Sequence, residues 1–320
     1  MLRASEEDME ELKPNPILKF NEGQLQSVRQ IVGYEDVNKL KQDLELLIDW
    51  IKKQNHFGVK EFDPEYLERV LIYNKGSIEN AKLRIEKTCT YVNLMPEFLK
   101  NYEFGNDFQP LLNIVNICVL PKPTRDNYRI LISQFTGIED NKFDILDYYR
   151  YHVVIGLHTL YYDYCVGFEL IIDLRMLTLG IVTKFNPVTM KKGLTLIVET
   201  TGERVKKVHL LCGSKFLETV ILLAKQGLSA KLRERLVLHN NIESLYDHIP
   251  REELPKNYGG YEKSTKELSD MNYEEWSSDI HKSRLKLLEN SATDESLRLP
   301  CKFNEEYSGM PGSFKKLCVD

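Results

Sequence analysis

The stretch 167–174, GFELIIDL, decides the fold class, because it is a short run of β-favouring residues between two long helical patterns. Similar runs occur at 128–135 and 206–212. Strands that alternate with helices are typical of a mostly parallel sheet with helices laid across it. The sequence therefore predicts an α/β fold for this part of the chain.

Helical patterns precede and follow this region. Apolar residues recur at helical spacing between 37 and 54, and Pro64 suits the first turn of a further helix. Turn-forming residues at 121–127 mark the change to the α/β region, and a helix is expected at 272–289. We predict an all-helical module at 1–109, an α/β domain at 110–260, and a C-terminal helix with an extended tail at 261–320.

Length and composition favour a folded chain without a membrane anchor. Of the 320 residues, 42% are apolar, which is enough for a sizeable core. No window approaches about 18 uninterrupted apolar residues, and the acidic start MLRASEED does not fit a secretory or mitochondrial leader. The six cysteines are scattered, without a C-x-x-C pair or a nearby histidine cluster, so we expect free thiols and no metal. The expected compartment is the cytosol.

One basic segment departs from an otherwise acidic chain. The net charge is −5, which argues against nucleic acid as a partner. Residues 202–236 nevertheless carry eight basic and three acidic side chains. This segment is the expected contact with an anionic surface.

The sequence lacks the motifs of the common α/β enzymes. There is no G-x-G-x-x-G, no G-x-x-x-x-G-K-[ST], no G-x-S-x-G and no H-E-x-x-H. His152, His158 and His209 have no nucleophile or carboxylate that can be named as a partner, so we interpret them as packing or surface residues. We expect that the protein is not an enzyme and uses no cofactor.

The stretch 231–260, KLRERLVLHNNIESLYDHIPREELPKNYGG, resembles the carboxyl-terminal signature of the CRAL-TRIO lipid-transfer family. Further stretches agree in order: a helical module at 63–85, the linker LPKP at 120–123, and the strands at 167–174 and 204–211. The ending is similar to the insect branch that resembles α-tocopherol transfer protein. The resemblance covers about residues 25–320 and implies a lipid-binding domain with a sheet floor, helical walls and a movable lid helix. Cys212 and Gln226-Gly227 depart from the usual family residues.

The expected floor of the pocket follows from strand alternation. Side chains alternate with period two, so each of two strands presents three residues on one face. These are Phe168, Leu170 and Ile172, and Val208, Leu210 and Cys212. From the residues alone, an ordinary packed core remains the alternative, because buried parallel strands are apolar on both faces. The expected walls are Tyr148, Tyr151, Val154, Leu179, Phe185, Leu196 and Ile197.

The expected lid is a helix at 215–228 with Ser214 as its N-cap. One stripe, Leu217, Val220, Ile221 and Ala224, is expected to close over the pocket. Phe216 and Leu223 form a second stripe. They either contact the membrane when the lid opens or pack against a neighbouring helix.

The resemblance assigns a phosphoinositide-binding role to four basic residues, Arg204, Lys206, Lys231 and Arg235. Arginine and lysine suit phosphate, and each contributes about 1 kcal/mol near an anionic bilayer. A solvated helix face is the alternative.

The predicted function is a monomeric, cytoplasmic carrier that binds one hydrophobic ligand of the tocopherol, retinoid, carotenoid or phospholipid class. Peripheral association with phosphoinositide-containing membranes would allow the ligand to exchange. The alternative is a ligand-regulated membrane-trafficking adaptor that senses lipid and binds a protein partner.

Overall fold

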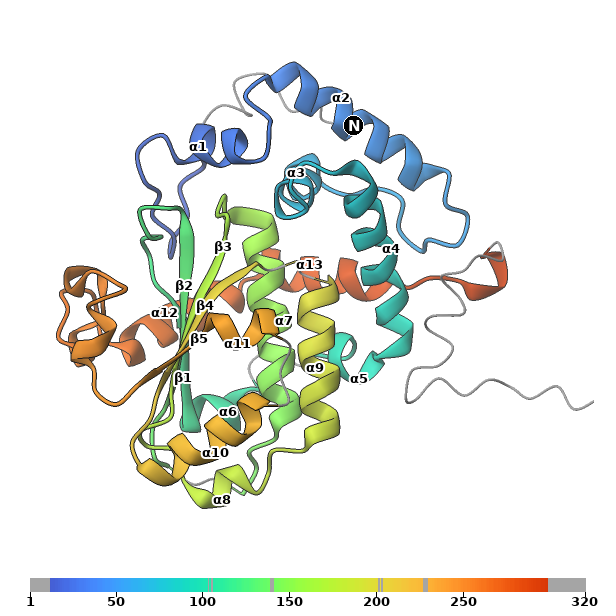
Figure 1. The fold of residues 1–320 in the computed structure, drawn as a ribbon. Coiled ribbons are helices and arrows are strands. Elements are labelled where there is room, and N and C mark those ends of the chain that lie inside the picture. The colour runs from blue at the N-terminus through green and yellow to red at the C-terminus, as the bar shows by residue number, and fades with distance from the viewer. Residues whose placement is uncertain are drawn as a thin grey trace, which may run out of the picture.

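A five-stranded sheet forms the centre of the fold (Figure 1). The computed structural model describes residues 12–102, 104, 106–138, 141–200, 202, 204–226 and 230–298. The strands are β1 (Val115–Val119), β2 (Tyr128–Phe135), β3 (Gly167–Asp173), β4 (Val205–Leu211) and β5 (Leu236–His239), in that order across the sheet. β1 pairs antiparallel with β2, and the other neighbours are parallel. The predicted mostly parallel α/β fold is confirmed, with two strands that the sequence analysis did not find.

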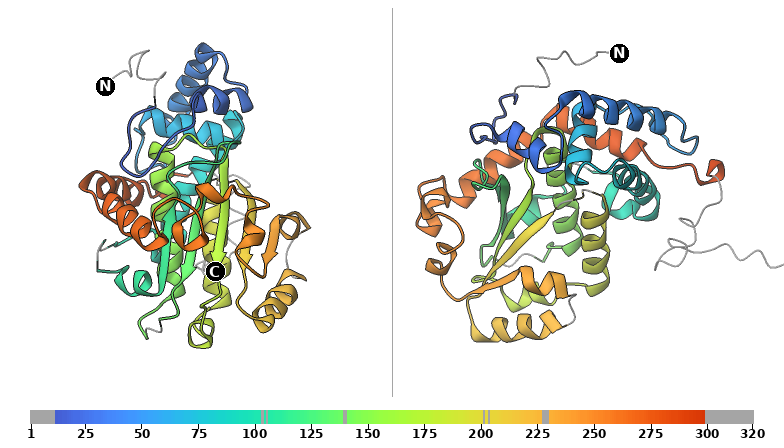
Figure 2. Two further views of the ribbon diagram at one scale, coloured as in Figure 1. Left: turned by 90° about the vertical axis from the view of Figure 1, so that its left-hand side faces the viewer. Right: turned by 45° about the horizontal axis from the view of Figure 1, so that its top comes forward.

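Helices cover one face of the sheet. α7 (Ile145–Tyr162) and α9 (Pro187–Thr200) lie side by side on this face, while α8 (Leu179–Val182), α10 (Lys215–Gln226) and α11 (Ala230–Arg235) complete the region (Figure 1). α10 lies at the rim of the molecule, at the bottom of Figure 1 and of the right view of Figure 2. Asp144 begins α7 by accepting a hydrogen bond from the Leu146 amide through its side chain.

The opposite face is covered by the segment after β5. Three short turns, η2 (Glu243–Leu245), η3 (Arg251–Glu253) and η4 (Lys256–Tyr258), lead to α12 (Thr265–Trp276). The left view of Figure 2 shows this orange region in front of the strands. Gly259 ends the last turn at φ 76°, and a Cβ on Gly260 would lie 1.9 Å from the Leu254 carbonyl oxygen. Both glycines of the YGG ending are therefore required by the backbone.

The N-terminal helices pack at the upper end of the sheet and along α7 and α9, and the last of them leads into β1 (Figure 1). They are α1 (Gln24–Ile31), α2 (Val37–Lys52), α3 (Pro64–Tyr73), α4 (Ile78–Leu94), α5 (Pro96–Leu99) and α6 (Gln109–Ile114). Asp36, Asp63 and Ser77 cap three of them through their side chains. Their apolar faces join the core on the side of α7.

The single helix predicted at 272–289 is wrong, because two helices occupy this region. α12 ends at Trp276, and α13 (Asp279–Asn290) begins after Ser278. The Ser278 hydroxyl accepts a hydrogen bond from the His281 amide and so starts a new helix. A last turn, η5 (Glu295–Leu297), precedes Arg298, which binds Glu86 and Glu295. The predicted tail beyond residue 298 lies outside the described residues.

Within the described residues, every helix is too short or too polar to cross a bilayer. Cys89, Cys118, Cys165 and Cys212 are free thiols, and all four are buried. Cys301 and Cys318 lie outside the described part of the chain.

His281 makes the stability of the C-terminal helices depend on pH. Burial, together with the nearby charges of His158 and Arg284, lowers the pKa of His281 to about 3. The ring is fully buried, whereas in the unfolded chain it takes up a proton near pH 6.5. The neutral ring therefore supports folding above pH 6.5, and this contribution is lost as the pH falls toward 3, by about 2 kcal/mol between pH 7 and pH 5.

We predict that the free energy of unfolding falls less in His281→Asn than in the wild type when the pH is lowered from 7 to 5. The two decreases should differ by about 2 kcal/mol. Urea unfolding at the two pH values measures the difference. Equal losses in the two proteins would contradict the assignment.

Candidate functional site

The two faces of β3 and β4 have different surroundings. Ile171 and Leu211 pack with the segment after β5, in a separate core that includes Leu245 and Ile249. The alternate residues, beginning with Phe168, face α7. In-register parallel pairing places Leu170 beside Val208 and Ile172 beside Leu210. The structure therefore brings five of the six predicted floor residues onto one face, which we call the floor: Phe168, Leu170, Ile172, Val208 and Leu210. The sixth, Cys212, is buried and directly follows the end of β4.

The floor is incompletely covered. On the opposite face, Ile171, His209 and Leu211 are 0% exposed. On the floor, Leu170 and Ile172 are only half-buried although β3 is the central strand, and Val208 is half-buried as well. A parallel sheet with helices on both faces normally buries such side chains completely. The floor is thus an apolar surface whose middle is only partly covered by the side chains that the structure describes.

β5 extends this surface. Leu236 is the partner of Val208, and Leu238 is the partner of Leu210, so both point to the floor side. Both are half-buried. Neither residue was among the predicted floor residues, although the apolar run L-V-L at 236–238 was a usable signal for a short strand.

Polar groups of α7 meet the floor at one place. The Tyr148 hydroxyl donates a hydrogen bond to Ser133 Oγ over 3.0 Å, and Ser133 lies beside Ile172 in the register. His152, one turn later, donates from Nδ1 to the Tyr148 carbonyl over 2.7 Å, which leaves Nε2 as the acceptor of a neutral ring. Burial raises the pKa of Tyr148 to about 12 and lowers the pKa of His152 to about 4. Near neutral pH the site therefore offers an uncharged hydroxyl and an uncharged imidazole.

Three other predicted wall residues lie near the floor side or in α9. Phe185 lies near the floor side, with its ring 6.4 Å from that of Phe135. Leu196 is fully buried in α9, and Ile197 is half-buried. Tyr149, which was not predicted, contacts α9 at Gly193.

Three predicted wall residues are placed elsewhere. Tyr151 lies on another side of α7 from Tyr148, and its ring packs 5.4 Å from Trp276 and 5.1 Å from Phe108. Val154 is fully buried in α7. Leu179 is 66% exposed on α8. The structure thus does not bring Tyr151 and Leu179 together with the floor, because the direction of a helical side chain depends on how the helix is rotated against its neighbours.

The predicted lid helix forms as α10. Its first turn is capped by Ser214, whose hydroxyl accepts a hydrogen bond from the Leu217 amide over 3.3 Å. Leu217 and Ile221, four residues apart, are half-buried, and Leu222 is 46% exposed. The side chains of Phe216, Val220, Leu223 and Ala224 lie outside the described part of the structure, as does Gly227.

A bulge in β4 redirects one of the predicted headgroup ligands. Val205 is opposite Phe168 and Lys207 is opposite Glu169, so Lys206 is the extra residue. Lys206 therefore points to the Glu169 side of the sheet rather than the floor side. Its ammonium lies 2.9 Å from Glu169 and 3.1 Å from Asp126.

The four predicted headgroup ligands differ in their surroundings. Partial burial acts to lower the pKa of Lys206, but Glu169 and Asp126 raise it overall, so Lys206 is a cation with two carboxylate partners. Arg204 and Arg235 are half-buried, and the side chain of Lys231 lies outside the described residues. The structure thus separates Lys206 from the other predicted ligands by its ion pairs.

The opposite face carries a feature that the sequence analysis did not expect. Within the described residues, His209, His239 and His248 bring one ring nitrogen each within 4.8 Å of the others, which makes them a candidate metal site. Sequence separations of 30 and 9 residues hid this group.

Part of the chain is similar in sequence to known proteins. Residues 115–260, from the first residue of β1 to the second glycine of YGG, match the family model of the CRAL/TRIO domain. The chain is 23% identical to alpha-tocopherol transfer protein-like of Mus musculus over 68% of its length, and 25% identical to clavesin-1 of Rattus norvegicus over 71%. The alignments span 64% and 65% of those relatives. The solved structure of Sfh5 aligns with a TM-score of 0.47 at 13% identity, over 73% of this chain and 91% of that one.

The contact between α7 and α9 gives a prediction about the helical wall. A Cβ on Gly193 would lie 2.2 Å from Cγ of the Tyr149 ring, so Gly193→Ala must push the two helices apart. We expect a loss of about 1–3 kcal/mol in the free energy of unfolding, measured with urea. Tyr149→Leu in the Gly193→Ala background should recover part of this loss.

Leu194→Ala is the matched control, because Leu194 is 51% exposed on the same helix. It should change the free energy of unfolding by less than about 0.5 kcal/mol. Equal effects of Gly193→Ala and Leu194→Ala would show that α9 does not depend on this close approach.

Proposed function

Because this chain belongs to the CRAL/TRIO family of lipid-binding and lipid-transfer proteins, we propose that it carries one hydrophobic ligand above its floor and exchanges that ligand at anionic membranes. The incomplete cover of Leu170, Ile172 and Val208 is the observation that supports this proposal. Exposed apolar surface is unfavourable by about 25 cal/mol per Å², so a bound ligand that covers these side chains is stabilised by removing them from water. No bond is made or broken in this function.

The polar groups of α7 suit a ligand with one polar end. Tyr148, Ser133 and His152 form a connected group next to the floor, and their side chains are uncharged near neutral pH. A hydroxyl or carbonyl on an otherwise apolar molecule can pair with such groups without placing a charge in an apolar site. Tocopherols, retinoids and carotenoids with oxygen functions meet this requirement, whereas a phospholipid would have to keep its charged headgroup away from these groups.

Exchange requires that the cover of the floor opens. α10 is the proposed lid, because it lies at the rim and leaves Leu217 and Ile221 only half-buried. Phe216 and Leu223 are proposed to enter the membrane interface together with the exposed Leu222. An apolar surface on a helix at the rim is suited to contact with acyl chains.

Lys231 and Arg235, in the helix that leads into β5, are the proposed headgroup ligands, together with Arg204, which directly precedes β4. Lys206 is a weaker candidate than the sequence suggested, because a phosphate would have to compete with Glu169 and Asp126. In this proposal the protein works as a monomer in the cytosol that contacts membranes transiently.

The first test separates a ligand floor from an ordinary packed core. Val208→Phe adds volume on the floor, and Ile171→Phe adds the same kind of volume on the sealed face. We predict that Val208→Phe keeps the melting temperature within a few degrees but lowers loading of a fluorescent tocopherol or phospholipid by about tenfold. Ile171→Phe should lose about 1–3 kcal/mol of stability.

If both variants were destabilised to the same degree, the floor would be a filled core and the carrier proposal would fail. Native mass spectrometry of the wild type from its natural source identifies the co-purifying molecule. Loading that is normal in Val208→Phe would also count against the floor.

The second test concerns delivery. We predict that Lys231→Ala with Arg235→Ala leaves ligand loading intact and weakens binding to phosphoinositide vesicles by roughly thirtyfold, from about 1 kcal/mol for each charge. Transfer to such vesicles, followed by fluorescence, should slow accordingly, and high salt should reduce the difference.

Lys52→Ala with Lys53→Ala is the matched control, since it removes the same charge from exposed positions at the end of α2. This control should transfer at the wild-type rate. Equal slowing in both double variants would mean that net charge, and not the basic segment, governs delivery. A protein that loads ligand but never transfers it would favour the adaptor alternative.

A further inference from the structure

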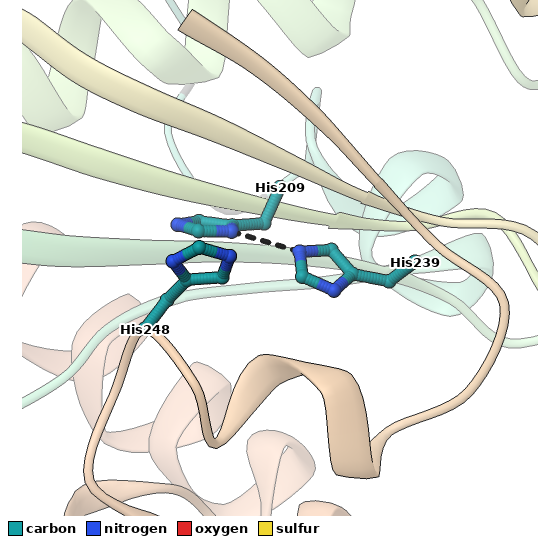
Figure 3. A group of neighbouring side chains, drawn as sticks. All are labelled: His209, His239 and His248. Atoms are coloured by element: carbon teal, nitrogen blue, oxygen red, sulfur yellow. Dashed lines mark hydrogen bonds between the residues drawn. The ribbon is translucent and has the colours of Figure 1, made fainter.

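Three histidines converge on the side of the sheet opposite to the floor (Figure 3). His209 is in β4 and His239 ends β5, and both rings are buried. His248 belongs to the loop that follows and is exposed. Figure 3 shows the three rings turned toward one another from these separate segments.

The hydrogen bonds of Ser244 fix the proton on His239. The Ser244 hydroxyl donates to the Asn241 carbonyl over 2.9 Å, so its oxygen can only accept from His239 Nδ1, at 2.7 Å. His239 therefore carries its proton on Nδ1. The lone pair on Nε2 then points toward His209, whose Nδ1 lies 2.9 Å away.

Glu169 fixes the proton on His209 in the same way. One carboxylate oxygen binds the Lys206 ammonium at 2.9 Å, and the other lies 3.4 Å from His209 Nε2. A carboxylate only accepts, so Nε2 is the donor and Nδ1 of a neutral ring holds a lone pair. Two lone pairs would then face each other over 2.9 Å, which is unfavourable unless a cation lies between them.

We propose that this group binds a divalent transition-metal ion of the zinc class through His209 Nδ1, His239 Nε2 and one ring nitrogen of His248. Imidazole is a preferred ligand of such ions, and three histidines with a solvent position form a common coordination set. Glu169 and Ser244 complete the pattern, because metal-binding histidines usually donate their other N–H to a carboxylate or another oxygen.

The geometry requires small movements. Bonds of 2.0–2.1 Å in a tetrahedron place ligand nitrogens about 3.4 Å apart, so the buried pair opens by about half an ångström and His248 moves inward. The Lys207 ammonium donates to His248 Nδ1 over 3.1 Å. That bond must break when the ion binds, because the ring cannot offer a lone pair to both. Lys207 is thus a built-in competitor of the metal.

The test uses zinc chloride alone on the full chain after treatment with a chelator. Isothermal titration calorimetry should show one ion per chain, and the melting temperature should rise with zinc concentration, because only the folded chain brings the ligands together. His248→Ala should bind at least about tenfold more weakly, with an unchanged melting temperature in the absence of metal because the residue is exposed. Ser244→Ala should also bind about tenfold more weakly.

Lys207→Gln should bind zinc more tightly than the wild type, because the competing ammonium is removed from His248. If the three histidines had only a structural role, this substitution would not raise the affinity for zinc. Cys301→Ser with Cys318→Ser is the control for binding to thiols and should leave the affinity unchanged. The proposal is overturned if His248→Ala binds as well as the wild type or if binding disappears with the two cysteines. It is also overturned if a tenfold excess of zinc does not bind, which would leave a shared proton as the cation between His209 and His239.

Discussion

The alternation of side chains along β3 and β4 is the constraint on which the rest of the structure depends. One set of residues, including Ile171 and Leu211, is sealed by the segment after β5, while the other set forms the floor beneath α7. The fully buried face fixes the strands against the segment after β5. A hydrogen bond adds to this contact, since the Tyr258 hydroxyl donates to Asp173 at the end of β3 over 2.8 Å. The floor face is then free to remain partly uncovered without loss of the strand positions. A partly uncovered surface can exist on this sheet because the opposite face of the same strands is fully buried.

Much of this arrangement was readable from the sequence. The three β-favouring runs became β2, β3 and β4 within one residue at each end, and Ser214 begins α10 as a cap should. β1 and β5 were missed because each has only four or five residues and lies next to stronger signals, a turn-rich loop and a basic helix. The break between α12 and α13 was missed because two serines can continue a helix or cap a new one, and only tertiary packing decides between these states.

The site residues that the sequence misplaced share a physical cause. Tyr148 and Tyr151 lie in one tyrosine-rich helix, and their directions depend on how α7 is rotated against the sheet and α12. Lys206 changes sides because of one bulge residue, which reverses the alternation for the part of the strand that precedes it. The histidine group depends on the register of β4 against β5, which places His209 near His239. Each of these features is set by how elements meet, and local sequence patterns do not report that.

The short strand β5 connects the proposed activities. It follows α11 directly, so Arg235, a proposed headgroup ligand, is next to Leu236 on the floor. At its other end, His239 belongs to the proposed metal site. β5 has four residues, so its floor side chains and His239 belong to one short segment. An ion held by His209 and His239 would fix β5 against β4, and the floor residues Leu236 and Leu238 would then keep their positions while α11 responds to a membrane. Metal and membrane would in that case act on the same edge of the sheet. The metal would hold β5 in place, and the membrane would release α10 beside it.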